Sequence, residues 1–442
     1  MSKISMIGLG CPKNQVDAEM LLATLINAGF EIQPEVENSD VVIINTCGFI
    51  DSAKQEAIDC ILYASELKSE GLLGGIVVTG CLAERYKEEI SMEMPEVDAV
   101  VGIGSNGDIA KICREVIDGK KVNSFRSKYD LSLEGDRVLT TPPHYAYLKI
   151  AEGCSNCCTY CAIPSIRGKF RSRKMDNIVA EAESLAKKGV KELIVVAQDT
   201  TRYGIDIYGA LMLPELLKKL CKINGIEWIR LLYCYPECMT DELIDTIASE
   251  DKICKYIDLP LQHADGDILK RMNRTGDEES LTALIEKIRS RIPEVIIRTT
   301  FITGFPGESD DNFETLSHFI NNIGFERLGC FAYSPEEGTI AARMDNQIED
   351  EIKQHRSGLI MERQYGVLFS KQESRVGTVM KVIVDGFDDE NMFYVGRTYM
   401  DAPEIDTIVI ISTEDELFAG DVIDVKIIGV DDCDLVGEVV TE

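Results

Sequence analysis

The chain has 442 residues, enough for about three domains, and its apolar content of 45% is ordinary for a folded globular protein. It carries 76 acidic against 46 basic residues, so its net charge of −30 argues against broad nucleic-acid binding and favours a basic partner or simply solubility. No apolar run approaches the roughly 18 to 20 residues that span a bilayer, so no membrane partner is expected.

Fifteen cysteines are spread irregularly along the chain, and an odd number does not indicate a disulfide framework. The first residues become polar too quickly for a secretory signal peptide. Together these features predict a cytoplasmic protein in a reducing compartment, with thiols that bind metal.

Residues 1–125 alternate short apolar runs with amphipathic helical stretches, which is typical of a doubly wound parallel α/β sheet. Three of these runs, at 4–9, 41–44 and 75–78, are followed by Cys11, Cys47 and Cys81. Because the carboxyl ends of parallel strands share one edge, we expect the three thiols to converge there. A three-cysteine iron–sulfur cluster is the favoured interpretation, and buried packing thiols are the alternative. Cys60 and Cys113 fall within helical patterns and are assigned to the core.

After a linker at 125–143, strands and helices alternate six times, which predicts an open, partial (βα)6 barrel over residues 140–370. The expected strands are 145–151, 192–197, 228–233, 256–261, 295–302 and 327–333. The expected helices include 175–188, 213–223, 240–249, 278–291 and 310–323. Barrel chemistry is carried by the carboxyl ends of the strands.

A cysteine-rich loop directly follows the first of these strands. Cys154, Cys158 and Cys161 have the spacing C-x3-C-x2-C, and three thiolates can each bind one iron of a [4Fe–4S] cluster. The fourth iron then stays open to a small molecule, whereas clusters that only carry electrons usually have four cysteine ligands. A structural zinc loop is less favoured because zinc prefers two separated ligand pairs. Buried thiols without a metal are the other alternative. Cys157 is not one of the three by spacing, although its ligation is left open.

This cysteine pattern resembles that of the radical S-adenosylmethionine (radical SAM) enzymes. Three segments, GCPKNQVDAEM (10–20), NTCGFI (45–50) and VVTGCLAERY (77–86), resemble the amino-terminal domain of the methylthiotransferases, and the resemblance covers the whole chain. It implies two [4Fe–4S] clusters and SAM as cofactors. One cluster, at Cys154, Cys158 and Cys161, cleaves SAM to a 5′-deoxyadenosyl radical, and the other presents a sulfur. A second SAM supplies the methyl group.

The resemblance also implies residues that contact SAM, of which several lie at strand ends: Tyr160, Gln198, Asp199, Gly304, Gly307 and Glu308. The glycines permit close backbone approach to a ligand, and an ordinary tight turn is the alternative. His263 is either a structural residue or a substrate contact. Five cations lie within residues 167–174, where they either hold a carboxylate of SAM or of the substrate or form a solvated face.

Residues 349–374 are expected to form a helical connector, and the short alternating strands of 372–442 predict a small five-stranded β-barrel. This part resembles the TRAM domain. Residues 375–442 contain 4 basic and 17 acidic residues, a net charge of −13. Each phosphate contact needs a cation, so direct RNA binding is not expected, whereas a basic protein would be attracted.

Four motifs resemble the branch of the family that modifies a ribosomal protein: GCPKN, PPHYAYLKIAEGC, RLLYCYPE (230–237) and GRTYMDAPEID (396–406). Gln15 departs from that pattern, in which leucine is expected. The resemblance implies methylthiolation at the β-carbon of an aspartate in the basic ribosomal protein S-twelve of the small subunit, with a low-potential electron donor. No side chain is expected to act as general base. The alternatives are methylthiolation of adenosine in transfer RNA and a non-catalytic iron–sulfur assembly factor of the ribosome.

Overall fold

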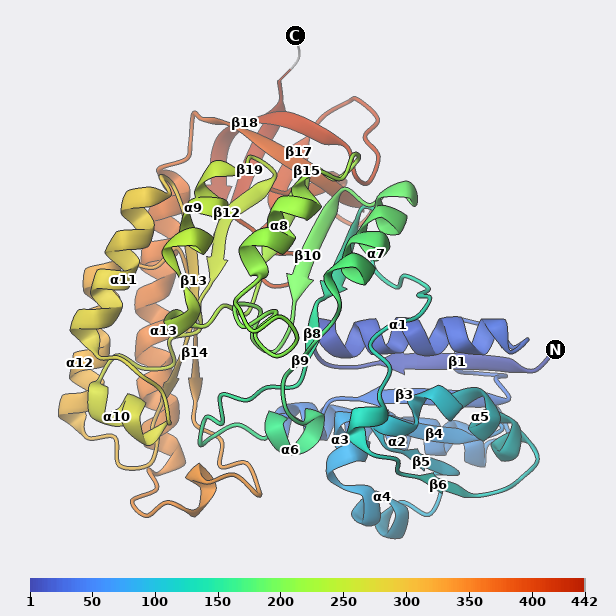
Figure 1. Ribbon diagram of the computed structural model, residues 1–442. Coiled ribbons are helices and arrows are strands. Elements are labelled where there is room, and N and C mark those ends of the chain that lie inside the picture. Colours follow the sequence, from blue (N-terminus) through green and yellow to red (C-terminus); the bar gives the residue numbers. More distant parts are fainter. Residues whose placement is uncertain (441–442) are drawn as a thin grey trace. The chain divides into compact units, whose positions relative to one another are not determined.

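The computed structural model describes residues 1–440, which form two compact units (Figure 1). The first unit combines Met1–Thr140, Ala151–Arg173 and Ser334–Ala342, and the second contains the remaining described residues. Residues 151–173 thus lie with the amino-terminal part of the chain, although in sequence they follow the first central strand. No helix in residues 1–440 is long and apolar enough to cross a membrane.

The first unit is built on a sheet of six parallel strands in the order β2-β1-β3-β4-β5-β6. Its strands are β1 (Lys3–Gly8), β2 (Glu31–Ile32), β3 (Val41–Thr46), β4 (Ile76–Gly80), β5 (Ala99–Val101) and β6 (Val122–Ser124). The helices between them are α1 (Pro12–Asn27), α2 (Asp51–Ser69), α3 (Cys81–Arg85), α4 (Lys87–Glu93) and α5 (Ile109–Ile117). The short edge strands β2 and β6 were not expected from the sequence.

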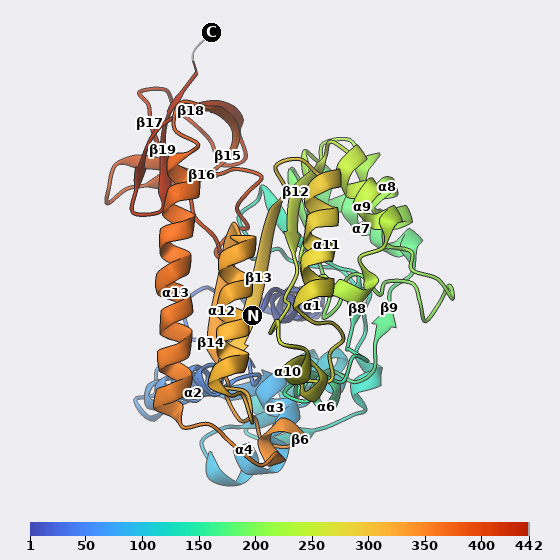
Figure 2. The ribbon, with the colours of Figure 1, turned by 90° about the vertical axis from the view of Figure 1, so that its left-hand side faces the viewer.

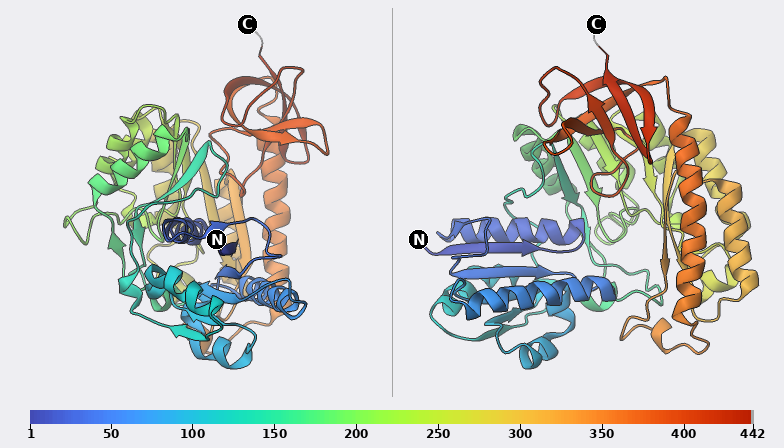
Figure 3. Two further views of the ribbon diagram at one scale, coloured as in Figure 1. Left: turned by 90° about the vertical axis from the view of Figure 1, so that its right-hand side faces the viewer. Right: turned by 180° about the vertical axis from the view of Figure 1, so that it is seen from behind.

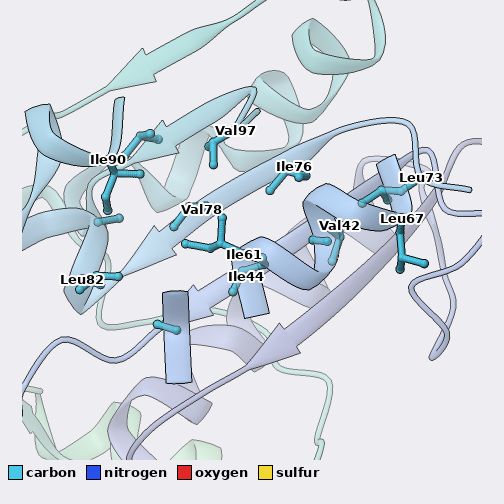
Figure 4. Close-up of a cluster of buried hydrophobic side chains, with 14 residues drawn as sticks. Val42, Ile44, Ile61, Leu67, Leu73, Ile76, Val78, Leu82, Ile90 and Val97 are labelled. Atoms are coloured by element: carbon cyan, nitrogen blue, oxygen red, sulfur yellow. The ribbon is translucent and has the colours of Figure 1, made fainter. Parts of the chain in front are cut away.

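Helices cover both faces of this sheet because successive strand residues point to opposite sides. On β3, Val42 and Ile44 pack with α2, α3 and α4, and Figure 4 shows this cluster around Ile61 of α2. Val41 and Ile43 point the other way and pack with α1 and α5. The doubly wound parallel sheet predicted from the sequence is confirmed. Cys113 lies in the core of α5, and Cys60 of α2 is only partly buried.

The second unit contains another parallel sheet, in the order β14-β13-β12-β11-β10-β7. Its strands are β7 (Tyr145–Lys149), β10 (Glu192–Val196), β11 (Trp228–Leu231), β12 (Ile253–Asp258), β13 (Ile296–Thr303) and β14 (Arg327–Ala332). Its helices are α7 (Met175–Lys187), α8 (Leu213–Cys221), α9 (Asp241–Ser249), α10 (Gly266–Arg271), α11 (Glu278–Arg291), α12 (Asp310–Ile323) and α13 (Asp350–Glu373). The strands follow chain order and β7 does not pair with β14, which confirms the open (βα)6 barrel.

Local signals explain which boundaries the sequence fixes well. The predicted helices 278–291 and 310–323 match α11 and α12, which begin at capping boxes formed by Asp277 with Ser280 and by Ser309 with Asn312. The strand expected at 256–261 instead occupies 253–258. Pro260 lies just beyond its end and lacks the N–H group that an interior strand residue donates.

A closed barrel of five strands ends the chain, in the order β15-β16-β17-β19-β18. The strands are β15 (Val379–Asp388), β16 (Phe393–Arg397), β17 (Val409–Ser412), β18 (Val422–Asp431) and β19 (Asp434–Val439). Helix α13 runs beside β14 and leads into the barrel, as Figure 2 and the view from behind in Figure 3 show. Both the five-stranded barrel and the helical connector predicted from the sequence are confirmed.

The segment between β16 and β17, residues 397–407, closes the amino-terminal end of the six-stranded sheet, and we call it the plug segment. Each of the six strands contributes one charged or hydroxyl side chain from its first four residues: Tyr145, Glu192, Arg230, Tyr256, Arg298 and Arg327. The plug residues that they contact are Arg397, Thr398, Tyr399, Asp401, Glu404 and Asp406.

Glu192 is the centre of these contacts. It is fully buried, and it accepts hydrogen bonds from Arg230 Nε at 2.6 Å and from Arg397 Nη1 at 2.8 Å. Burial alone raises the pKa of the Glu192 carboxyl, but the two guanidinium groups lower it below its ordinary value of 4.5. The plug is therefore held by buried, mutually neutralising charges, and removing one partner leaves the others uncompensated.

We expect Glu192→Gln to destabilise the protein by about 3–5 kcal/mol at pH 7, because buried Arg230 loses its carboxylate partner and Arg397 keeps only Asp385. Urea denaturation measures this loss. The ionised carboxyl stabilises the fold above pH 4.5 and stops doing so as the pH falls through the lowered pKa, so the gap between variant and parent shrinks in acid. Asp241→Asn, at an exposed carboxylate paired with Lys287, is the control and leaves the midpoint unchanged. Equal effects of the two substitutions would contradict this role.

Candidate functional site

Three cysteines lie at the carboxyl ends of three neighbouring strands in the first unit. Cys47 directly follows β3, and Cys81 directly follows β4. Cys11 is the residue before the first turn of α1, three residues after the end of β1. Strands β1, β3 and β4 are adjacent in the sheet. Burial raises the pKa of Cys47 and Cys81, and the neighbouring Cys11 thiol adds to the rise in both. The structure thus brings the three thiols together at the edge where the sequence placed them.

Glycines next to these cysteines allow the close approach. A Cβ on Gly10 would lie 2.7 Å from Cβ and 3.0 Å from Sγ of Cys47. A Cβ on Gly48 would lie 2.7 Å from Cα of Leu82, and one on Gly80 would lie 2.4 Å from the carbonyl oxygen of Thr46. Any larger residue at these positions would push the strand ends apart.

Cys81 is the most buried thiol of this trio and packs against Ala162 and Ile166. Burial raises its pKa to about 12, against the opposing effect of Arg167. Iron binds the thiolate, so metal binding here has to displace the proton. Burial of Cys81 therefore opposes the deprotonation that iron binding requires, and Arg167 favours it.

The second trio lies on the loop between β8 (Ala151–Glu152) and α6 (Ile163–Arg167). The base of the loop is closed by pairing of β8 with β9 (Arg171–Ser172) and by a hydrogen bond from Cys154 N to the carbonyl oxygen of Gly168 at 3.0 Å. Cys161 N donates to the carbonyl oxygen of Cys158, also at 3.0 Å. The Cys161 thiol has its pKa raised to about 12 by burial and by the nearby thiols of Cys158 and Cys154.

Two residues of this loop have backbone angles that few side chains adopt. Gly153 has φ of +77°, and a Cβ there would lie 2.4 Å from the carbonyl oxygen of Lys169. Cys157 has φ of +54° and an exposed side chain between the two ligand candidates Cys154 and Cys158.

No group of three or more Cys, His, Asp or Glu in residues 1–440 is arranged to hold a single metal ion. The thiolates of a cubane each bind a different iron, so they are spread over a whole cluster.

Arg167 is buried beside the first trio, so the expectation that it belongs to a solvated face is wrong. A role of residues 167–174 in holding a carboxylate of SAM or of the substrate stays a prediction. Its Nε and Nη2 atoms lie 3.3 and 3.2 Å from Cys81 Sγ. Its Nη1 atom is paired with Asp17 and lies 3.3 Å from Glu152, and Nη2 donates to Asn14 Oδ1 at 3.0 Å. Other cations of residues 167–174 are also engaged: Arg171 donates to the carbonyl oxygen of Tyr129, and Arg173 pairs with Glu134.

Sequence reasoning missed Asn14, Asp17 and Glu152 as partners of this arginine. Asn14 and Asp17 are three residues apart on α1 and therefore share a face, and both are buried. The buried residues of α1 also include Lys13 and Glu19, and this unusual number of polar residues on the helix is the signal that could have found Asn14 and Asp17.

The residues proposed to contact SAM in the second unit follow β10 and β13. Gln198 and Asp199 lie two and three residues after the end of β10. Asp199 is buried and accepts a hydrogen bond from Thr201 Oγ1 at 2.6 Å. Gly304 and Gly307 both have positive φ in the turn after β13. Tyr160, in the first unit, immediately precedes Cys161 in the cysteine loop. Contact of these residues with SAM stays a prediction.

The carboxylate of Glu308 has protein partners inside that turn. It accepts hydrogen bonds from Arg356 Nη1 at 2.6 Å and from the backbone N of Gly304 at 2.9 Å, and it lies 3.4 Å from His263 Nε2. A Cβ on Gly307 would lie 1.7 Å from Nη1 of Arg271. The glycines therefore also serve the packing of the turn itself, and His263 is buried within that packing.

Models of three families match successive parts of the chain. They are the Uncharacterized protein family UPF0004 at residues 3–102, the Radical SAM superfamily at 148–320 and the TRAM domain at 376–440.

Full-length relatives are also found. The chain is 49% identical to the ribosomal protein uS12 methylthiotransferase RimO of Lachnoclostridium phytofermentans, over 98% of this chain and 99% of the relative. It is 50% identical to the RimO protein of Caldanaerobacter subterraneus subsp. tengcongensis, over 99% of this chain and all of the relative.

Among solved structures, the chain resembles TsrM, a radical S-adenosylmethionine methyltransferase from Kitasatospora setae. The TM-score is 0.56 at 12% identity, over 75% of this chain and 73% of that one. At this identity the likeness concerns the fold alone.

We expect Gly153→Ala to lower the iron bound at the loop of Cys154, Cys158 and Cys161, because the new Cβ collides with the carbonyl oxygens of Gly168 and Lys169. Iron analysis after anaerobic reconstitution measures the loss. Gly189→Ala is the matched control, since Gly189 has φ of +98° with no atom within 4 Å of the added Cβ. Both variants bear the roughly 1–2 kcal/mol cost of a left-handed residue, but only the first deforms the loop. Equal iron contents would show that the loop tolerates the collision.

Proposed function

The chain belongs to the RimO family of ribosomal protein uS12 methylthiotransferases, and from this membership we propose that it inserts a methylthio group at the β-carbon of an aspartate in uS12, the protein S-twelve of the small subunit. The observation that carries the proposal is the pair of separate three-cysteine sets in one unit. A methylthio group needs both a carbon that is activated and a sulfur that is delivered, and two sets provide one site for each task.

The enzyme is a radical SAM methylthiotransferase whose cofactors are SAM and two [4Fe–4S] clusters. We assign one cluster to Cys154, Cys158 and Cys161, and the other to the trio of Cys11, Cys47 and Cys81. The donor chemistry fits, because each set offers three thiols, one set from the ends of three adjacent strands and the other from a single loop. When bound, the first cluster supplies the electron that cleaves SAM and the second supplies the sulfur.

The residues around each set hold the thiols in place. The β8–β9 pair and the Cys154–Gly168 hydrogen bond fix the cysteine loop, so its thiols need little rearrangement on binding. At the other set, glycines bring the strand ends close, and burial of Cys81 limits access of water. Tyr160, Gln198, Asp199 and the turn of Gly304, Gly307 and Glu308 are proposed to orient SAM.

Charge supports a basic protein as the substrate. The carboxyl-terminal barrel is strongly acidic, with a net charge of −13 over residues 375–442. It attracts a basic ribosomal protein and repels the phosphates of RNA. We place the reaction in the cytoplasm, where ribosomal proteins are made, with a low-potential electron donor as the second partner.

Cysteine variants test the division of labour. We expect Cys154→Ala to abolish reductive cleavage of SAM, and Cys11→Ala to spare cleavage but stop sulfur insertion. Product analysis by mass spectrometry, with methionine release as the readout of cleavage, separates the two steps. Cys157→Ala is the matched control within the same loop and keeps both activities. Iron counts support the assignment if each triple-cysteine variant retains one cluster, and loss of both activities in Cys11→Ala would indicate one shared site.

The choice of substrate is tested by offering purified uS12 and transfer RNA to the same reduced enzyme. We expect methylthiolation of uS12 only, because the acidic barrel lacks the cations that phosphates need. Salt tests the mechanism further, since a partner attracted by charge binds more weakly as ionic strength rises. Modification of adenosine would favour the transfer-RNA alternative. A reduced, reconstituted protein that fails to cleave SAM would favour the assembly factor.

A further inference from the structure

Arg167 occupies a position that none of the assigned functions uses. Its guanidinium is buried, and the edge formed by Nε and Nη2 faces a single sulfur, Cys81 Sγ, at 3.3 and 3.2 Å. These distances are within hydrogen-bonding range for an N–H donor and a sulfur acceptor. The same side chain belongs to the segment that carries the other cysteine trio, five residues after Ala162.

The other groups around Arg167 fix its orientation. The Nη1 atom faces the carboxylates of Asp17 and Glu152, and Nη2 also donates to Asn14 Oδ1. A guanidinium has five N–H donors in a rigid plane, so the contacts of Nη1 with the carboxylates also fix the direction in which Nε and Nη2 point. The two carboxylates also balance the charge of the buried guanidinium, which stabilises it in this position.

We propose that Arg167 is a positioning residue for the cluster assigned to Cys11, Cys47 and Cys81: it holds the Cys81 thiolate in the ligand orientation and raises the reduction potential of that cluster. This inference rests on the proposed function, because it needs the trio to bind a cluster. Partners of a ligand atom orient it and tune the metal, and hydrogen bonds to cluster sulfurs are among the factors that set its potential.

The direction of the effect follows from charge. Reduction adds an electron to the cluster. A neighbouring positive charge with two N–H donors therefore stabilises the reduced cluster more than the oxidised cluster. Removing Arg167 therefore makes the cluster harder to reduce. Arg167→Gln deletes the charge and leaves one amide donor, whereas Arg167→Lys keeps the charge but loses the planar pair of donors.

The test isolates the cluster in question. The parent for this test lacks Cys154, Cys158 and Cys161. In it we expect Arg167→Gln to lower the equilibrium constant for reduction of the remaining cluster at least tenfold, which is about 59 mV for one electron. Redox titration monitored by electron paramagnetic resonance measures it. Arg167→Lys should shift it less, in the same direction. Arg85→Gln is the matched control: Arg85 lies on the helix that begins with Cys81, but it donates to Glu336 and to the carbonyl oxygen of Gly48.

The possible outcomes distinguish a failure of the proposed function from a failure of the role of Arg167. A parent without any cluster would overturn the proposed function itself. A cluster present in parent and Arg167→Gln at the same potential would overturn the role of Arg167, as would an equal shift in Arg85→Gln. Loss of iron from Arg167→Gln with an unchanged melting temperature supports it, because Cys81 is then no longer held. Should this variant misfold, Asp17→Asn with Arg167→Gln removes both charges of the pair, and its potential is compared with that of Asp17→Asn alone.

Discussion

A positive charge that is taken out of water has to be balanced, and Arg167 shows how much of the first unit is arranged around that requirement. Its partners come from helix α1, from β8 and from the start of α3. These elements are far apart in sequence, and each contributes either a carboxylate or a sulfur. The loop that carries one set of thiols is thereby fastened to the sheet edge that carries the other.

The second unit follows the same rule at the opposite end of its strands. The plug segment supplies carboxylates to Arg298 and Arg327, an arginine to Glu192 and backbone carbonyls to Arg230. An open barrel exposes its amino-terminal end, and the interlocked charges close it with polar rather than apolar groups. The carboxyl ends of the strands are the usual place for ligands in such barrels.

Local patterns predicted most of the fold, and long-range pairing set the limit. Alternating apolar residues identified both parallel sheets, and Cys47 and Cys81 were placed correctly because they directly follow buried strands. The pairing of Arg167 with its partners was not predictable in the same way, since five cations lie close together in sequence and only the fold decides which of them lies beside Cys81. The plug motif was recognised as a signature, but its partners lie up to 259 residues away, as in the contact of Tyr145 with Glu404. The ligand roles of the six cysteines stay predictions.

The plug segment has a consequence for how such proteins can be recombined. The segment that connects β16 to β17 of the carboxyl-terminal barrel contacts a side chain from every strand of the neighbouring sheet. A chimera that receives a foreign barrel would carry a mismatched set of buried charges unless those six strand residues were transplanted with it. Substrate specificity carried by the barrel would then change only together with the six strand residues that contact the plug segment.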